Sequence, residues 1–344
     1  MRSLPTRVGS RYEVLRKLVR VSAPKLSIYL HASPLGDVER QQQSVRWHEL
    51  RQALAERGAV ATDLELLDRA VDDLPAGDRV LAALVSTGEI WVSAELEHSD
   101  ETDSAVLGTW PRIIPLLRWE QQQIPTVAAV VHHGEAELSV HRSGVPVDVP
   151  VTHELIVGAD DEIERNAPGG WSQSRYHRRA EDSWANNATE FAHDISDLVR
   201  SAGARLLALS GDVREVQLVL ERLPGDVRRM TRTDVRAKPG PDSSVRIDDA
   251  DLRRLMSDTA RLERRQAVVD FDEAGGRGRA VEGASEVRQA LTNGAAQRLI
   301  VVNGQASEEF DEMVSVAIDT DASIVVLEPE EITLVGGVGA MLRF

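Results

Sequence analysis

The sequence predicts a mixed α/β chain, α+β in its first part, that is divided into three domains. Its 344 residues exceed one typical domain of roughly 100–200 residues. Short apolar runs with the composition of buried strands alternate with segments whose apolar residues recur at helical spacing. Two stretches rich in glutamine, proline and glycine, Gln121–Pro125 and Lys238–Pro241, interrupt this pattern and indicate domain boundaries.

The first domain, residues 1–122, is expected to combine helices with a sheet. The run Leu26–His31 is rich in β-branched and aromatic residues, so it predicts a short buried strand. Apolar residues at helical spacing predict helices over 38–57 and 63–71. Residues 80–94 contain two apolar runs on either side of a Ser-Thr-Gly turn and therefore predict a hairpin.

The middle domain, residues 123–240, is expected to hold a mixed sheet covered by helices, in three layers. Two apolar runs within 126–141 flank a His-Gly-Glu turn and predict another hairpin. Prolines and glycines predict a loop over 142–172. A long helix is expected over 174–201 and ends before a glycine. Residues 205–222 then predict a buried strand followed by a helix.

The last domain, residues 241–344, is expected to form an α/β sandwich. A helix is predicted over 248–265, and helix, strand, helix and strand alternate between 284 and 327. The glycine cluster Gly275–Gly278 follows no strand and lacks the Gly-Lys-Ser/Thr ending of a phosphate-binding loop. We therefore interpret that cluster as a flexible joint.

Charge is distributed unevenly along the chain. A formal net charge of −16 argues against a general nucleic-acid coat, because polyanions are repelled by such a field. Residues 1–20 nevertheless carry six cations against one acid, and residues 222–238 carry six against two. Residues 59–107 carry twelve acids against two arginines, which is typical of a solvated face. Arginine far outnumbers lysine, which fits either a GC-rich genome or phosphate recognition by the guanidinium fork.

Several classes of protein are excluded by what the sequence lacks. It has no cysteine, which excludes disulfides and thiolate zinc sites and fits a cytoplasmic protein. No run of 18 apolar residues is present, so no membrane-spanning helix is expected. The pair His132-His133 has no third ligand at suitable spacing, so we expect no metal site and no cofactor. DNA is not an expected partner.

The segment 168–179, Pro-Gly-Gly-Trp-Ser-Gln-Ser-Arg-Tyr-His-Arg-Arg, differs from the rest of the chain. Gly169 and Gly170 predict an extended loop tip, and Trp171 and Tyr176 offer flat surfaces on which a base could stack. Cations in the first turns of a helix oppose its dipole, a penalty that an external polyanion would offset. These cations are Arg175, His177, Arg178 and Arg179. The alternative interpretation is an ordinary loop and a solvated helix start.

Two pieces of the chain resemble the archaeo-eukaryotic peptide release factor and Pelota superfamily. The first is Gly169-Gly170, which leads through Gln173 into a helix that opens with arginines and aromatics. The second is the last domain, where Glu286–Val301 resembles that family's helix, glycine turn and strand, and Gly336–Phe344 resembles its glycine-rich ending. The arginine-rich form looks most like the bacterial branch, which includes the ribosome hibernation factor Balon and its actinobacterial relatives.

The resemblance implies a three-domain, tRNA-shaped protein in the ribosomal A site. The first domain would reach the decoding centre, the middle domain would extend its loop toward the peptidyl-transferase centre, and the last domain would meet elongation factor Tu. Such a protein would protect idle ribosomes in stress or dormancy. The residues expected to contact rRNA are Gly169, Gly170, Trp171, Gln173, Arg175, Tyr176, His177, Arg178 and Arg179.

Two departures from the release factors favour a binder without catalytic activity. Trp171 and Ser172 stand between the glycines and the glutamine, and two residues at about 3.3 Å each displace a side chain by several ångströms. The first domain also lacks the Asn-Ile-Lys-Ser stretch that reads stop codons. The alternative is a ribosome-rescue peptidyl-tRNA hydrolase that uses Gly169, Gly170 and Gln173. A second alternative is a cytosolic interaction protein whose partner surface is the acidic stretch 59–107.

Overall fold

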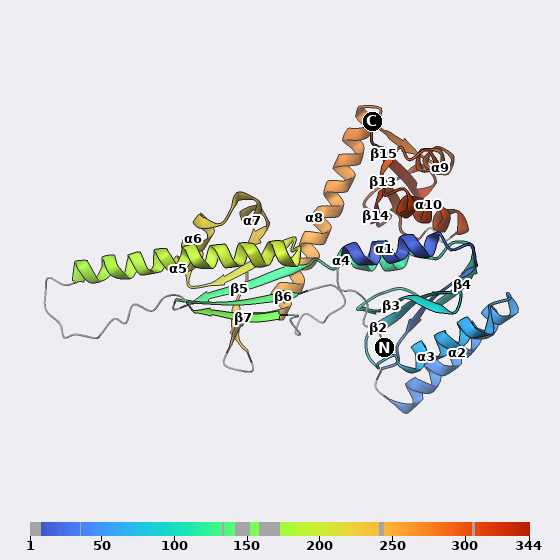
Figure 1. The fold of residues 1–344 in the computed structure, drawn as a ribbon, viewed down its shortest axis with the longest axis horizontal. Coiled ribbons are helices and arrows are strands. Elements are labelled where there is room, and N and C mark those ends of the chain that lie inside the picture. Colours follow the sequence, from blue (N-terminus) through green and yellow to red (C-terminus); the bar gives the residue numbers. More distant parts are fainter. Residues whose placement is uncertain are drawn as a thin grey trace. The chain divides into compact units, whose positions relative to one another are not determined.

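The computed structural model describes residues 8–34, 36–132, 134–141, 152–157, 173–240, 244–304 and 307–344. The chain forms two compact units (Figure 1). We call Met1–Gln121 with Leu262–Phe344 the terminal unit, and Gln122–Arg261 the middle unit. Each unit contains both helices and sheets, so the predicted mixed α/β class is confirmed. The division into three domains stays a prediction.

The first sheet of the terminal unit is antiparallel, in the order β3-β2-β1-β4. Its strands are β1 (Lys25–His31), β2 (Arg79–Ser86), β3 (Glu89–Glu97) and β4 (Ser104–Gly108). The predicted strand and hairpin are therefore confirmed. Side chains alternate along β1, so Leu26, Ile28 and Leu30 pack against the helices α2 and α3 while Tyr29 enters a second core on the opposite face. The two helices are α2 (Asp37–Glu56) and α3 (Ala61–Asp72).

Two helices of the terminal unit were not predicted, α1 (Val8–Val19) and α4 (Ile114–Gln122). In α1, Leu15 and Leu18 are fully buried and lie three residues apart, as on one face of a helix. The apolar stripe of α1 is short and is interrupted by charged residues, so its helical pattern in the sequence is weak. In α4, Pro115 lies in the first turn, where proline is tolerated.

The second sheet of the terminal unit has the order β12-β15-β13-β14, with β13 and β14 parallel. The helices α9 and α10 share a core with one face, and Phe271 of α8 joins Ile300 and Leu327 in a core on the other face. This arrangement confirms the predicted sandwich. Its elements are α8 (Asp249–Gly276), β12 (Ala280–Glu282), α9 (Ala284–Thr292), β13 (Ala296–Val302), α10 (Glu308–Asp319), β14 (Ser323–Leu327), the 3-10 turn Val335–Gly337 and β15 (Val338–Leu342).

The expectation of a flexible joint at Gly275–Gly278 was wrong in its first half, because α8 continues through Gly276. The helix ends only at the second glycine because Phe271 and Ala274, in its last turns, are buried at 4% and 6% exposure and hold it in place. Packing of an apolar face thus outweighs the roughly 1 kcal/mol that each glycine costs a helix.

A continuous core joins the two sheets of the terminal unit. It includes Leu15 and Leu18 of α1, Trp119 of α4, and Phe310 and Val314 of α10. The amino-terminal and carboxy-terminal stretches of the chain therefore fold as one body.

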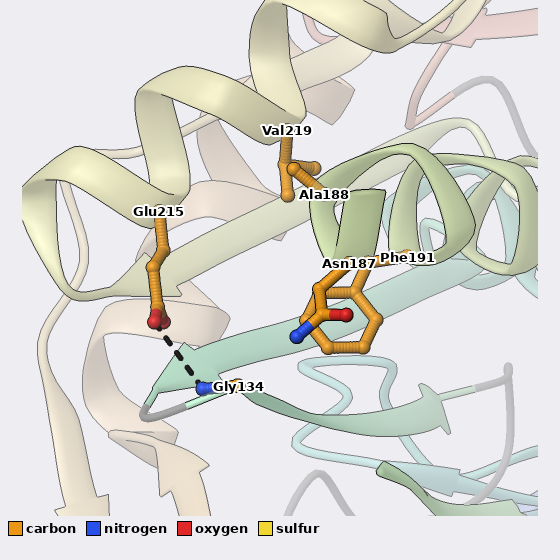
Figure 2. A pocket seen from close by; sticks show the side chains of 6 residues that line it. All are labelled: Gly134, Asn187, Ala188, Phe191, Glu215 and Val219. Carbon is orange, nitrogen blue, oxygen red and sulfur yellow. Dashed lines mark hydrogen bonds between the residues drawn. The ribbon is translucent and has the colours of Figure 1, made fainter. Parts of the chain in front are cut away.

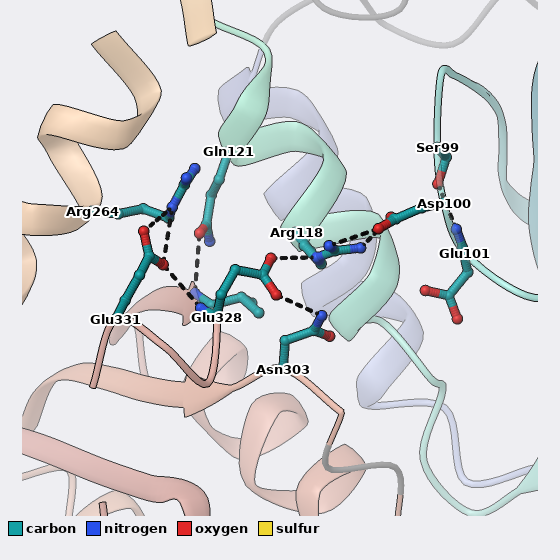
Figure 3. Close-up of polar contacts among 10 residues, drawn as sticks. Ser99, Asp100, Glu101, Arg118, Gln121, Arg264, Asn303, Glu328 and Glu331 are labelled. Atoms are coloured by element: carbon teal, nitrogen blue, oxygen red, sulfur yellow. Dashed lines mark hydrogen bonds and ion pairs between the residues drawn. The ribbon is translucent and has the colours of Figure 1, made fainter. Parts of the chain in front are cut away.

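Polar contacts reinforce this junction (Figure 3). The Nε of Arg118 donates to Oε1 of Glu328 at 2.7 Å, and the same guanidinium pairs with Asp100. The side-chain amide of Gln121 donates to the carbonyl of Ile324 at 3.1 Å and accepts from the N–H of Val326 at 3.0 Å. Gln121 thus satisfies the backbone of β14 in the way that a neighbouring strand would.

The middle unit is built on a five-stranded mixed sheet in the order β7-β6-β5-β8-β9. The pair β5–β6 is antiparallel and β5–β8 is parallel, so the predicted hairpin and mixed sheet are confirmed. Its strands are β5 (Thr126–His132), β6 (Glu135–His141), β7 (Thr152–Val157), β8 (Leu206–Gly211) and β9 (Thr231–Arg232). A small hairpin, β10 (Ala237–Pro239) and β11 (Val245–Ile247), lies outside that sheet.

The prediction of an uninterrupted loop over 142–172 was wrong, because β7 pairs with β6 inside that range. Prolines and glycines on both sides masked a run of only six residues, Thr-His-Glu-Leu-Ile-Val. It lies at the edge of the sheet and Leu155 is 52% exposed. Such a strand buries little and so leaves a weak pattern in the sequence.

Helices cover both faces of the middle sheet, which confirms the three layers. Ala188 to Val199 of α5 and Val219 of α6 pack on one face. Leu252, Leu255 and Met256 of α8 pack on the other face. The helices are α5 (Gln173–Ala202), α6 (Val213–Arg222) and α7 (Gly225–Met230). The predicted glycine stop of α5 is confirmed by Gly203, whose φ is +61°.

Candidate functional site

The predicted site segment leads into α5, the longest helix of the middle unit. Gln173 is the first residue of α5, and Arg175, Tyr176, His177, Arg178 and Arg179 lie on its first two turns. Gly169, Gly170 and Trp171 lie outside the described residues. The structure therefore places the cationic segment on a helix, as the sequence predicted, and the roles of its side chains stay predictions.

The second half of α5 anchors the helix to the sheet. Ala188, Phe191, Ile195 and Val199 are at most 3% exposed and follow the spacing of one helical face. Gln173 begins about 22 Å before Ala188 along the helix axis, at 1.5 Å per residue. Figure 1 shows the first turns of α5 extending past the ends of the strands β5 to β7. The helix thus holds its first residues away from the sheet.

A hydrogen bond joins the β5–β6 turn to α6, next to the second half of α5. The side chain of Asp212 caps α6 by accepting from the backbone N–H of Arg214 at 2.9 Å. The N–H of Gly134, in the β5–β6 turn, donates to Oε1 of Glu215 at 3.2 Å (Figure 2). Gly211 has φ +132°, and a Cβ there would lie 1.8 Å from the carbonyl oxygen of Val131. Only glycine fits this crossing.

A hollow at this junction is too small for a metabolite. Its cavity volume of about 10 Å³ is at the lower limit for one water molecule, whereas small-molecule sites measure roughly 300–1,000 Å³. Figure 2 shows the residues that line it. They are Gly134, Asn187, Ala188, Phe191, Glu215 and Val219. We therefore interpret the hollow as a packing defect between α5, α6 and the turn.

The histidine pair gives no support to a metal site. The Nε2 of His132 lies 3.4 Å from Oε1 of Glu137, and His133 lies outside the described residues. Within the described ranges, no three histidine or acidic side chains are grouped to hold a metal ion. Over the same ranges, no helix is long and apolar enough to cross a membrane.

The described cations of the cluster at residues 1–20 pair with acids within the fold. Arg16 pairs with Asp321 at 2.5 Å, and Arg20 pairs with Asp319 at 2.5 Å. Lys17 pairs with Glu13 of the same helix at 3.2 Å. The two arginine contacts join α1 to the end of α10. Among the described cations of this cluster, pairing with acids therefore favours a structural role over phosphate recognition.

Acids of the stretch 59–107 also have structural partners. Oδ2 of Asp103 lies 2.9 Å from Nε of Arg46 in an ion pair, and Asp68 accepts from Nε of Arg51 at 2.8 Å. Asp63 is 5% exposed and accepts from the N–H of Gly88 at 2.6 Å. The interpretation of the whole stretch as a solvated face was therefore wrong for these three acids.

Comparisons with known proteins match the middle of the chain to a defined family. Residues 125–277 match the model of bacterial archaeo-eukaryotic release factor family 2. An uncharacterized protein of Mycobacterium tuberculosis is 27% identical over 304 residues, which cover 85% of this chain and 78% of that protein. The protein pelota homolog of Methanocorpusculum labreanum is 28% identical over 255 residues, covering 70% of this chain and 68% of that protein.

Solved structures of Pelota proteins match the chain with low scores. The structure described as ribosome-bound archaeal Pelota has a TM-score of 0.43 at 12% identity, and the match covers 99% of this chain and 95% of that one. The Archaeoglobus fulgidus Pelota crystal structure has a TM-score of 0.35 at 14% identity and covers 99% and 94%. The family match and the pelota homolog support the resemblance to the release factor and Pelota superfamily inferred from the sequence, and residues 125–277 match the model of bacterial archaeo-eukaryotic release factor family 2.

Proposed function

We propose that this protein is a ribosome hibernation factor. It binds the A site from the decoding centre to the peptidyl-transferase centre and protects idle ribosomes together with elongation factor Tu. Each of the three domains makes its own contact. Residues 1–122 lie toward the decoding centre, 123–240 extend their loop toward the peptidyl-transferase centre, and 241–344 meet elongation factor Tu.

One observation supports this proposal most directly. The chain matches a release factor family over 125–277, and within that range Gln173 to Arg179 form the first turns of α5, about 22 Å by helix rise from Ala188, a core residue of the same helix. A cationic helix end on a rigid arm suits a narrow site that is walled by rRNA phosphate. The spacing of two residues between the glycines and Gln173 favours occupancy of that site over catalysis.

The test is co-sedimentation of the full chain with vacant bacterial ribosomes, with and without elongation factor Tu and GDP, across a salt series. We expect binding that falls with salt and that competes with aminoacyl-tRNA for the A site. Absence of binding under every condition would overturn the proposal.

The second candidate function is peptidyl-tRNA hydrolysis in ribosome rescue. It is favoured by Gly169, Gly170 and Gln173, which preserve the residue types of the catalytic loop. A wild-type chain that releases peptide from ribosomes would support it. The variant Gln173→Ala should then lose well over tenfold in rate, as expected for a lost transition-state donor, while the exposed control Gln41→Ala keeps the wild-type rate. No turnover by wild type is the result expected of a hibernation factor.

A further inference from the structure

A second group of cations lies on the middle unit, away from the start of α5. It comprises four residues from the end of α6, from α7 and from β9, and we call it the arginine face. Its members are Arg222, Arg228, Arg229 and Arg232. Arg228 and Arg229 are exposed, and Arg222 and Arg232 are partly exposed.

Contacts at helix ends gather these side chains in one place. The Nη2 of Arg228 donates to the carbonyls of Glu221 and Leu223, at 2.6 and 3.0 Å, at the end of α6. Arg222 lies at the same end and donates to the carbonyl of Leu218 at 2.9 Å. The Nη1 of Arg232 donates to the carbonyl of Arg229 at 3.2 Å, at the end of α7. The four side chains therefore cluster around two neighbouring helix ends.

The arginine face has no carboxylate partner among the described residues, unlike many other arginines in the described part of the chain. Arg236 and Arg254 of the same unit pair with Asp251 at 3.1 Å and Asp234 at 3.0 Å. By contrast, Arg222, Arg228 and Arg232 bond only backbone carbonyls and the hydroxyl of Thr189.

Nearby acids do not neutralise the positive charge of the arginine face. Asp226 lies 3.8 Å from Arg200, and Asp234 is paired with Arg254. Glu221 is the remaining acid of this stretch, and it offers its backbone carbonyl to Arg228. Among the described residues 221–232, four guanidinium charges thus stand against two carboxylates, one of which also lies near Arg200. In a chain of net charge −16, such a local excess of positive charge is unusual.

Helix capping alone does not account for the face. Cations near helix carboxy-terminal ends are favourable, and Arg222, Arg228 and Arg232 have this role. Each guanidinium has five N–H donors, and the capping bonds use only part of them. Arg229 is exposed and makes no side-chain bond in the described structure. The capping bonds fix the direction of three guanidinium groups and leave donors facing solvent, the arrangement that binds phosphate oxygens.

We infer that the arginine face is a binding site for the phosphate backbone of structured RNA, and that it forms a second ribosomal RNA contact of the middle unit. The second half of this inference rests on the proposed function. The site recognises backbone charge and geometry, since the face presents neither an exposed aromatic side chain nor a pocket for a base among its described residues.

The test compares two triple variants of the full chain. The face variant is R228Q/R229Q/R232Q, and the matched control is R261Q/R277Q/R288Q, whose arginines are exposed or partly exposed and paired with acids. Each variant removes three positive charges from the same net charge of −16. Binding is measured without elongation factor Tu, both to vacant ribosomes by sedimentation and to a fluorescein-labelled RNA duplex by anisotropy, across a salt series. The single variant R229Q, which breaks no described bond, serves if the triple variant fails to fold.

We expect the face variant to bind ribosomes and the duplex on the order of tenfold more weakly, with a flatter salt dependence. Each lost phosphate contact lowers the slope of log K against log salt by about 0.7–0.9. The control variant should match wild type, and R229Q alone should lower the slope by about one contact. A face variant indistinguishable from the control would overturn the inference and leave ribosome binding intact. Failure of wild type to bind ribosomes would overturn the proposed function instead, and the duplex measurement then decides the RNA site by itself.

Discussion

A buried carboxylate gives the terminal unit a stability that depends on pH. Asp311, in the first turn of α10, is 3% exposed, and its Oδ2 lies 3.7 Å from Nε of Arg112. Burial raises the pKa of Asp311 from 3.8 to about 6, with a smaller contribution from the charge of Glu308, while Arg112 acts in the opposite direction. Desolvation of the carboxylate therefore outweighs its attraction to arginine.

The sign and size of the effect follow from this shift. Because the folded state holds the proton more tightly than the unfolded state, the contribution to stability is fully present below pH 3.8 and is lost as pH rises through about 6. A shift of about two units corresponds to roughly 3 kcal/mol in the free energy of unfolding. Asp311→Asn has no such proton to lose. The free-energy difference between Asp311→Asn and wild type should therefore move by about 2.4 kcal/mol in favour of the variant between pH 4 and pH 7.

Urea unfolding followed by tryptophan fluorescence measures this difference. Four of the six tryptophans report on the terminal unit, namely Trp47, Trp91, Trp110 and Trp119. The control is Asp72→Asn, because Asp72 is an exposed residue of α3 in the same unit. A free-energy difference for Asp311→Asn that stays constant across this pH range would refute the reasoning, whatever its absolute size.

Three further predictions concern single contacts. Arg118→Ala should destabilise the terminal unit by about 1–3 kcal/mol, because it leaves the partly buried Glu328 without its cation; a wild-type urea midpoint would contradict this. Gly211→Ala should cost more than about 3 kcal/mol and unfold the middle unit in circular dichroism, since the new Cβ meets a carbonyl oxygen at a strained φ. Gly225→Ala, which meets nothing within 4 Å, should be near neutral. Asp212→Ala should lower thermal stability by about 1 kcal/mol through loss of the α6 cap, and equal melting temperatures would speak against it.

The fold could be predicted where the spacing of apolar residues agrees with the positions of turn and helix-ending residues. The hairpins β2–β3 and β5–β6 and the helix α5 follow from alternation, turn residues and a glycine stop. Prediction failed where tertiary packing decided the outcome. The edge strand β7 buries little, and α8 runs through two glycines because its apolar face is held by the sandwich.

For the candidate site, the part that the structure confirms is the helical backbone. Composition and family resemblance located Gln173 and the arginines after it, and the helical backbone there is as expected. The sequence could not show which other cations are neutralised inside the fold. Arg16 and its partner Asp321 are 305 residues apart, and no local pattern links them. The arginine face is therefore visible only once the partners of the other arginines are known.

The internal pairing of charges also bears on how an acidic chain could bind RNA. An overall charge of −16 repels polyanions at long range, but the Debye length at physiological salt is about 8 Å. At that screening, a phosphate that touches Arg229 is influenced mainly by charges within the arginine face. Paired arginines such as Arg254 carry their own counter-charge at 3.0 Å and attract it little. Under the proposed function, acids elsewhere would suppress unspecific association while the arginine face would retain local attraction, so selectivity for a shaped RNA site needs no basic protein.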